Sequence, residues 1–349
     1  MSENTKWRAW IAAPALLATG ALALTGCIGN APPEESSGSD TVVSGTGNDE
    51  PGDTVKIGFS APAADHGWMG AITKSALSTA EQYDDVELLQ AEATNDVNMQ
   101  ISGIETFIND GVDAIVLLPF DGDALTEVSL KAMEAGIPVI NVDRELSSPF
   151  ASRVTVLGDN YGMGVSAGTY MCEQLGDNPD AVIAEIQGIA NLPLTQDRSQ
   201  GFADALDDCG LKVSTQVAAD FTIQGGETAT SNLLQAEPEI DAIWNHDDDQ
   251  GVGVLAAIDN AGRDEFFMVG GAGSLDVMEM IKADDTVMKA TVVYPSTQAA
   301  DGIKLARLVA QNKNMGDLVS ANVPRKIQLD APVVTSENVD DYIGLGFES

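Results

Sequence analysis

Polar and aromatic residues of types that are scarce in this chain recur directly after short apolar runs. Both histidines, His66 and His246, fall at such places. The residues whose types suit the binding of a small molecule are Asp65, His66, Trp68, Asp143, Arg144, Asn160, Arg198, Phe221, Asp247 and Tyr294. Their carboxylates accept hydrogen bonds, their guanidinium groups donate them, and their rings can cover an apolar face of a ligand.

This mixture suits a molecule with several hydroxyl groups. A hydroxyl group both donates and accepts, so its site needs carboxylates beside fixed guanidinium forks. The C–H faces of a sugar or polyol lie flat on aromatic rings, and Trp68, Phe221 and Tyr294 can supply that wall. We therefore expect a sugar or polyol as ligand, and we expect neither a cofactor nor a metal.

Structural interpretations compete with this one. Asp143 and Arg144 could form an ion pair at the edge of a lobe, and Arg198 could pair with a surface acid. We expect Asp248 and Asp249 to belong to a solvated acidic run or to cap the next helix.

Two chemical alternatives use the histidines. Asp65, His66, His246 and Asp247 could together ligate a metal, although the chain has no HxxxH or CxxC spacing. Either histidine with a carboxylate could act as an acid and base in an enzyme. No GxxxxGK[ST] motif supports catalysis, and we expect no enzyme. Trp244, next to the second histidine, is expected to point into the core.

The apolar runs have the length of strands that are covered on both faces. They are residues 55–61, 86–92, 113–120, 138–144, 154–160, 181–188, 211–221, 241–248, 266–273 and 288–294. Amphipathic helical patterns separate them, so the sequence predicts an α/β protein with parallel sheets. Ligands of such folds bind beyond the carboxyl ends of the strands, where the polar and aromatic residues fall.

Ten strands are many for one sheet, which favours two Rossmann-like lobes. Connections without a helix, after Asp143-Arg144, at Tyr294-Pro295 and near 326–329, are where the chain could cross between them. We expect residues 54–157 with 295–327 in one lobe, and residues 158–294 with 328–345 in the other, so that each lobe is discontinuous in the sequence.

Composition excludes several classes of partner. Lys and Arg number 17 against 54 Asp and Glu, which gives a formal net charge of −37. So acidic a surface repels phosphate backbones, and we expect no nucleic-acid partner. The 44% hydrophobic content is enough for real cores, and 349 residues suit about two domains.

The N-terminal 26 residues resemble a secretory signal. Lys6 and Arg8 precede an apolar run that is too short to span a bilayer. Residues 24–27, Leu-Thr-Gly-Cys, resemble a bacterial lipobox, which implies diacylation of Cys27 after cleavage of residues 1–26. Residues 27–53 then form a lipid anchor and flexible linker, rich in Pro, Gly, Ser and acids. Outside the cytoplasm, Cys172 and Cys209 can form a disulfide or remain as thiols.

Residues from about 54 to 340 resemble the ribose-binding type of periplasmic solute-binding proteins of ABC importers. The motifs that carry the resemblance are GVDAIVLLPFDGDAL (111–125), AGIPVINVDREL (135–146), VLGDNYGMGVSAG (156–168), EIQGIANLPLTQDRSQGF (185–202), DAIWNHDDDQGVGVLAAIDNAG (241–262) and VYPSTQAADGI (293–303). The resemblance implies two Rossmann-like lobes, joined by a three-strand hinge, that close over a sugar. It also implies an ABC permease as partner, an extracytoplasmic location, membrane contact through the lipid only, and a monomer.

The resemblance also assigns individual residues. Asp143 and Arg144 match the Asp-Arg pair of the family's ligand site, and Arg198 matches its ligand arginine. Phe221 matches an aromatic residue of the second lobe, and Trp68 matches the stacking aromatic of the first loop.

Other positions depart from the family pattern. Asp247 stands where the family usually has asparagine, and Ala272 stands where it commonly has a ligand-binding aspartate. Leu118 replaces a frequent asparagine, and residues 64–68 read ADHGW in place of Asn-Pro-aromatic. These departures argue against ribose itself. They leave open a polyol, another pentose or hexose, or a furanone-type signal molecule. An autoinducer or metal receptor on the same fold is a further alternative.

Overall fold

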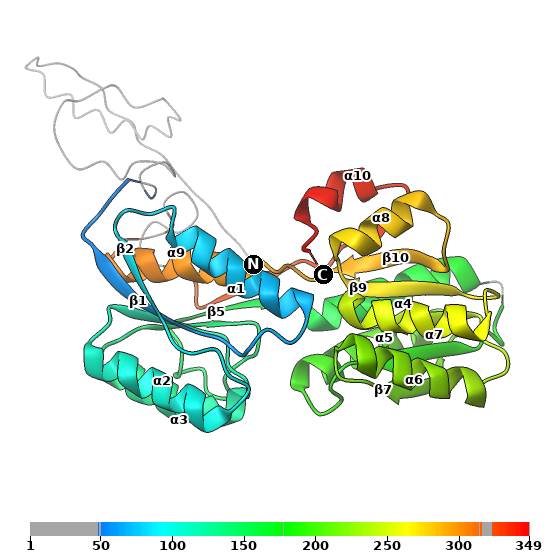
Figure 1. Ribbon diagram of the computed structural model, residues 1–349, viewed down its shortest axis with the longest axis horizontal. Helices are drawn as coiled ribbons and strands as arrows, with labels where there is room; N and C mark the ends of the chain where they lie inside the picture. The colour runs from blue at the N-terminus through cyan, green and yellow to red at the C-terminus, as the bar shows by residue number, and fades with distance from the viewer. Residues whose placement is uncertain (1–47, 49, 177, 314, 316–322, 349) are drawn as a thin grey trace, which may run out of the picture. The chain divides into compact units, whose positions relative to one another are not determined.

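The computed structural model describes residues 48, 50–176, 178–313, 315 and 323–348. The predicted signal sequence and Cys27 lie outside these residues, as does most of the predicted linker. Two six-stranded sheets organise the chain, and helices cover both faces of each (Figure 1). This confirms the expected α/β architecture of two lobes. None of the helices described is long and apolar enough to cross a bilayer.

The first sheet has the strand order β11-β5-β4-β3-β1-β2, and all its neighbouring strands are parallel. Its strands are β1 (Val55–Ser60), β2 (Val86–Gln90), β3 (Ala114–Leu117), β4 (Val139–Val142), β5 (Val154–Gly158) and β11 (Lys326–Leu329). Helices α1 (Gly67–Ala80) and α9 (Gln298–Ala310) cover one face, and α2 (Val97–Asp110) and α3 (Gly122–Glu134) cover the other (Figure 1).

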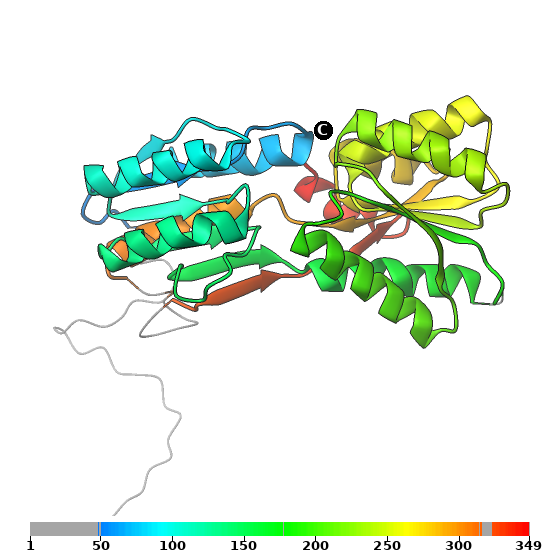
Figure 2. The same ribbon diagram turned by 90° about the horizontal axis from the view of Figure 1, so that it is seen from below.

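The second sheet has the order β12-β10-β9-β8-β6-β7, in which only β12 runs antiparallel to its neighbour. Its strands are β6 (Ile183–Gln187), β7 (Val213–Ala218), β8 (Ala242–Asn245), β9 (Phe267–Ala272), β10 (Met288–Val293) and β12 (Val333–Thr335). Helices α4 (Asn160–Leu175) and α5 (Pro193–Asp208) cover one face. Helices α6 (Ile223–Ala236), α7 (Asp248–Ala261) and α8 (Leu275–Ala283) cover the other (Figure 2). The short α10 (Val339–Tyr342) and the 3₁₀ turn Ile343–Leu345 lie beside α8.

Local chemistry explains why the helices begin and end where they do. The carboxylates of Asp96, Asp121 and Asp159 each accept a hydrogen bond from a backbone N–H in the first turn of the next helix. Helices α2 and α7 end at Gly111 and Gly262, which have φ angles of 64° and 63°. This left-handed conformation favours glycine, because it is strained in a residue that has a Cβ. The aspartate caps fix where α2, α3 and α4 begin, and so hold the loops that follow β2, β3 and β5 in place.

The chain crosses between the sheets after β5, after β10 and after β11. The predicted crossing after Asp143-Arg144 is wrong, because Ile140 of β4 pairs with Val154 of β5 in one sheet. Gly158 pairs with Leu329 in the first sheet, so both residues belong to the first lobe. The predicted boundaries had placed both of them in the second lobe. Strand β11 is absent from the predicted strands, because its residues alternate between exposed and half-buried.

Part of the predicted linker is bound to the first lobe. Arg307, which is buried, makes two 2.7 Å contacts with Asp85 and donates a 2.9 Å hydrogen bond to the carbonyl oxygen of Glu50. The N–H of Gly52 donates to Asp85 at 2.6 Å. A carboxylate and guanidinium that share these bonds fix the chain as it enters β1, so residues 50–53 are not a free linker.

A disulfide joins Cys172 of α4 to Cys209 at the end of α5, 37 residues apart in the sequence. The two helices pack closely along the same face of the second sheet. The bond therefore ties the first two helices of the second lobe together.

Removal of this bond should destabilise the second lobe. For a 37-residue separation, the loop-entropy relation gives a loss of about 4 kcal/mol in the free energy of unfolding. Replacing both cysteines by alanine, or adding reductant, should therefore lower the midpoint of chemical unfolding. If the wild type has the same midpoint with and without reductant, and the double variant has that midpoint too, the disulfide contributes nothing to stability.

Candidate functional site

Residues from both lobes surround a cavity of about 30 Å³ at the carboxyl ends of the strands. The side chains around it are His66, Trp68, Met69, Asp143, Arg144, Leu194, Arg198, Phe221, Asp247, Ala272 and Tyr294. Most of the ten predicted ligand residues are among them. Asp65 and Asn160 do not line the cavity, but each bonds a residue that does.

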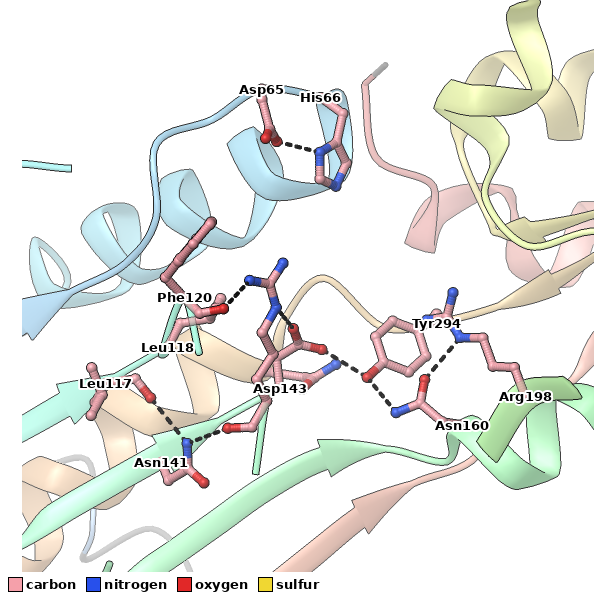
Figure 3. Close-up of polar contacts among 12 residues, drawn as sticks. Asp65, His66, Leu117, Leu118, Phe120, Asn141, Asp143, Asn160, Arg198 and Tyr294 are labelled. Atoms are coloured by element: carbon pink, nitrogen blue, oxygen red, sulfur yellow. Dashed lines mark hydrogen bonds and ion pairs between the residues drawn. The ribbon is translucent and has the colours of Figure 1, made fainter. Parts of the chain in front are cut away.

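A continuous series of hydrogen bonds crosses the site from the second lobe to the first (Figure 3). The Nε–H of Arg198 donates to Asn160 Oδ1 at 2.9 Å, and Asn160 Nδ2 donates to the Tyr294 hydroxyl at 3.1 Å. That hydroxyl donates to Asp143 Oδ1 at 2.8 Å. We call these four residues the interlobe relay. Every link has one donor and one acceptor, so the buried polar groups along it are paired.

The surroundings of Tyr294 keep its hydroxyl protonated. Burial and the neighbouring Asp143 carboxylate raise the pKa of Tyr294 far above its ordinary value. The guanidinium carbon of Arg198 lies 4.7 Å from the centre of its ring. A Cβ at Gly158 would lie only 2.1 Å from the ring, so this glycine leaves the space that Tyr294 fills.

The relay leaves specific atoms available to a ligand. Among the residues described, Asp143 Oδ2, Arg198 Nη2 and Asp247 Oδ2 make no hydrogen bond. Arg144 donates through Nη1 to the Phe120 carbonyl oxygen, while its buried Nε has no hydrogen-bond partner and lies 3.8 Å from Asp143 (Figure 3). Donors and acceptors thus both face the cavity, as expected from the sequence.

Three residues of the site have left-handed backbone conformations. Asp143, Phe221 and Ala272 have φ angles of 62°, 69° and 83°. Such angles are strained for residues with a Cβ and are common where side chains must be aimed at a ligand. A Cβ at Gly188 would lie 1.9 Å from the Phe221 ring, so a second glycine makes room for an aromatic residue of the site.

The loop before α1 brings a histidine against the second lobe. Asp65 Oδ1 lies 2.5 Å from His66 Nδ1 (Figure 3). The ring of His66 stacks on Phe221 with centroids 6.2 Å apart. Burial alone would lower the pKa of His66. The bond to Asp65, helped by the carboxylates of Asp247 and Asp249, raises that pKa above its ordinary value. Asp65 thus orients the ring and favours its charged form.

Trp68 is more buried than a stacking platform would be. Its exposed fraction is 5%, its indole N–H donates to the Tyr294 carbonyl oxygen at 3.0 Å, and the two rings lie 5.4 Å apart. Trp68 therefore packs the first loop against a crossing segment as well as bordering the cavity.

The acidic run at the start of α7 is buried, which corrects the prediction of a solvated run. Asp247 caps the helix through the N–H of Gln250, and burial raises the pKa of Asp247 to about 6. Asp248 accepts bonds from the backbone N–H groups of Gly271 and Ser274, among others. Asp248 thus holds the end of β9, and only Asp247 lines the cavity.

His246 is in the core and not in the site. It is completely buried, and its Nε2 lies 2.8 Å from Glu185 Oε1. Trp244 packs beside it with ring centroids 4.2 Å apart and points into the core, as expected. Burial lowers the pKa of His246, so its ring is neutral at neutral pH. Within the described part of the chain, no group of three or more potential metal ligands occurs.

Sequence reasoning missed Met69 and Leu194, which line the cavity, whereas it had placed Ala272 at a ligand position of the family. It also missed Asn141, a fully buried amide in β4 whose Nδ2 donates to the Arg144 carbonyl oxygen at 2.9 Å. This amide shapes the turn that carries the Asp-Arg pair (Figure 3). An asparagine inside an otherwise apolar strand was the available signal.

A larger cavity of about 400 Å³ shares Asp143, Arg144 and Leu194 with the first one. Acidic residues of both lobes line it, including Asp121 and Asp197. The rings of Trp68, Phe221 and Tyr294 border the smaller cavity and not the larger one, so the predicted aromatic wall lies at the smaller cavity.

The pKa values of the two histidines should be shifted in opposite directions from the ordinary value of about 6.5. His66 should lose its proton above that value, because protonation strengthens its bond to Asp65. His246 should remain neutral to lower pH, because its site is dry. Protonated His66 thus stabilises the fold fully below about pH 6.5, and this contribution is lost as the pH rises through its folded pKa. Neutral His246 stabilises the fold above about pH 6.5, and this contribution falls as the pH is lowered.

NMR titration of the two imidazole rings measures both values, with His66→Gln assigning the signals. Asp65→Asn should lower the pKa of His66 and leave that of His246 unchanged. Two rings that both titrate near pH 6.5, or that titrate in the reverse order, would contradict the described surroundings.

Three comparisons place the chain among known proteins. The ribose import binding protein RbsB of Bacillus subtilis (strain 168) is 31% identical over 254 residues, which cover 71% of this chain and 81% of the relative. A crystal structure from Mycobacterium smegmatis in complex with β-D-fucofuranose has a TM-score of 0.75 at 26% identity, covering 83% of this chain and 94% of that one. An ABC transporter solute binding protein from Mycobacterium smegmatis with bound glycerol has a TM-score of 0.75 at 26% identity, and the match covers 85% of this chain and 99% of that one.

The Periplasmic binding protein domain family matches residues 57–314, which include most strands of both sheets and every residue around the small cavity. On this match and on the two-lobed architecture, the chain belongs to the periplasmic binding protein family.

Proposed function

We propose that this protein is the extracytoplasmic substrate-binding lipoprotein of an ABC importer, and that it captures a sugar or polyol between its lobes. The observation that supports this most directly is the convergence on one cavity of Asp143 and Arg144 from the first lobe with Arg198 and Phe221 from the second. Hydrogen-bonding groups of both polarities beside aromatic rings are what a polyhydroxylated ligand needs.

The charges around the cavity favour a ligand without net charge. Asp143 and Asp247 face Arg144 and Arg198, so neither sign is in excess among these four side chains. A strongly charged ligand would leave a buried group of its own sign without compensation. Hydroxyl groups can bond to both kinds of side chain.

Lobe closure is the proposed mechanism, with no covalent step. A cavity of about 30 Å³ has room for about two water molecules, so a ring of five or six atoms enters only when the lobes separate. A ligand that bonds both lobes stabilises the closed arrangement by its differential affinity. A membrane permease then recognises the closed protein and receives the ligand.

The departures at Ala272 and Asp247 bear on which ligand is bound. Ala272 provides no acceptor, and the Tyr294 hydroxyl already takes one oxygen of Asp143. The relatives suggest what to test first, since their names and structures include ribose, β-D-fucofuranose and glycerol. We propose a furanose or a small polyol and not ribose itself.

Anchoring belongs to the same proposal. Acylation of Cys27 and a tether that ends where Glu50 and Gly52 contact the first lobe would hold a monomer at the membrane surface. The acidic surface would then face the surrounding solution.

The test begins with a panel of furanoses, pyranoses and polyols, followed by calorimetry and thermal shift. One compound should raise the melting temperature and bind with measurable heat. Arg198→Ala should then weaken its binding by roughly 2 kcal/mol, about 30-fold, because buried hydrogen-bond partners lose their donor.

Arg263→Ala is the matched control. This arginine of the same lobe bonds Glu265 and carbonyl oxygens at the end of α6, away from the cavity, so affinity should stay unchanged. A panel without any binder would count against the proposed function, and an Arg198→Ala variant with wild-type affinity would mean that the ligand binds elsewhere.

A further inference from the structure

Helix α1 does not cap its own N-terminus. His66 occupies the N-cap position with an extended backbone, its side chain makes no capping hydrogen bond, and the first turn contains no acidic residue. The first backbone N–H groups of a helix have no partner within the helix. Helix α2 of the same lobe solves this locally, since Asp96 accepts a 3.0 Å hydrogen bond from the N–H of Met99.

The missing acceptor comes from the other lobe. Asp249 Oδ2 accepts a 2.8 Å hydrogen bond from the backbone N–H of Trp68, the second residue of α1. Asp249 lies in the first turn of α7 and is 3% exposed, and 181 residues separate the two partners in the sequence. A carboxylate at a helix N-terminus is favourable both as an acceptor and through the helix dipole.

This contact joins the lobes without involving the ligand. Asp249 lines neither the small cavity nor the larger one beside it. The backbone it holds nevertheless carries His66, whose ring stacks on Phe221, and Trp68, whose indole N–H donates to Tyr294. The position of the first loop over the cavity therefore depends on a bond that forms only when α1 and α7 meet.

We infer that Asp249 is a positioning residue that caps α1 from the opposite lobe in the closed arrangement, and so couples lobe closure to the placement of His66 and Trp68. When the lobes separate, α1 loses its cap and Asp249 is hydrated. The role of this closure in ligand capture rests on the proposed function, but the bond itself can be tested without any ligand.

The test compares Asp249→Ala, Asp249→Asn and wild type in ligand-free buffer. Spin labels are attached at two exposed positions, Ser78→Cys on α1 and Thr228→Cys on α6. Double electron–electron resonance then measures the distance between the two lobes. Asp249→Ala should reduce the ratio of closed to open molecules by about tenfold, the size of a lost N-cap. It should also increase hydrogen exchange at the Trp68 amide by a similar factor. Asp249→Asn keeps an acceptor oxygen and should restore part of both effects.

Asp96→Ala is the control, because it removes a cap that lies entirely within the first lobe. It should lower thermal stability and leave both the interlobe distance and the Trp68 exchange unchanged. The inference is overturned if Asp249→Ala leaves the distance distribution and the Trp68 exchange as in wild type, or if Asp96→Ala changes them equally. It is also overturned if the wild type shows no closed component.

Should Asp249→Ala fail to fold, Asp249→Asn replaces it in the same comparison. This variant should then shift the distance distribution and the Trp68 exchange in the same direction by a smaller amount, and wild-type values for both would overturn the inference. Failure to find a sugar ligand would leave these results standing.

Discussion

The hydroxyl group of Tyr294 fixes the geometry on which the binding site depends. It accepts from Asn160 and donates to Asp143, and Asn160 in turn holds Arg198. In a buried environment each of these groups would be costly if it lacked a partner, so the interlobe relay keeps four side chains in a defined arrangement. The atoms that remain free around the cavity are those that the relay does not use.

The relay also narrows what can bind. One oxygen of Asp143 and one edge of Arg198 are satisfied by the protein, so a ligand competes only for the other oxygen and the other edge. The apolar methyl group of Ala272 lines the same cavity. The proposed site therefore offers fewer bonds than its polar residues suggest, which favours a compact polyhydroxylated ligand.

Backbone strain contributes to this arrangement. The left-handed conformations of Asp143 and Phe221 aim one carboxylate and one ring from opposite lobes at the same space. Each conformation costs of the order of 1 kcal/mol or more. Gly158 and Gly188 complement it, since side chains there would collide with Tyr294 and Phe221. The neighbouring strands thus accommodate the rings of the site.

The sequence predicted the two-lobed fold well because buried parallel strands read as continuous apolar runs, each followed by a helix. It predicted Asp143 at the carboxyl ends of one set of strands, and Arg198 and Phe221 at those of the other. That the two ends face each other was implied by the family resemblance. It could not predict β11, because a half-exposed edge strand has no continuous apolar run.

The sequence also did not predict which polar residues at the carboxyl end of β8 are buried. Asp248 and Asp249 look like a solvated run in the sequence, yet the backbone N–H groups that bind them belong to Gly271, Ser274 and Trp68, which are distant in the chain. His246 has the type and position of a ligand residue in the sequence, yet it pairs with Glu185 in the core. These partners come together only in the tertiary structure, so the local spacing of residues does not reveal them.

The most direct measurement is a crystal structure of the protein purified with whatever small molecule it carries from its source, together with mass spectrometry of that molecule. We expect a polyhydroxylated compound between the lobes. Its hydroxyl groups should lie within hydrogen-bond distance of Asp143 and Arg198, and one of its faces should lie against Phe221 or Trp68. A ligand bound on an outer face, or a compound without hydroxyl groups held between the lobes, would contradict the proposed binding site.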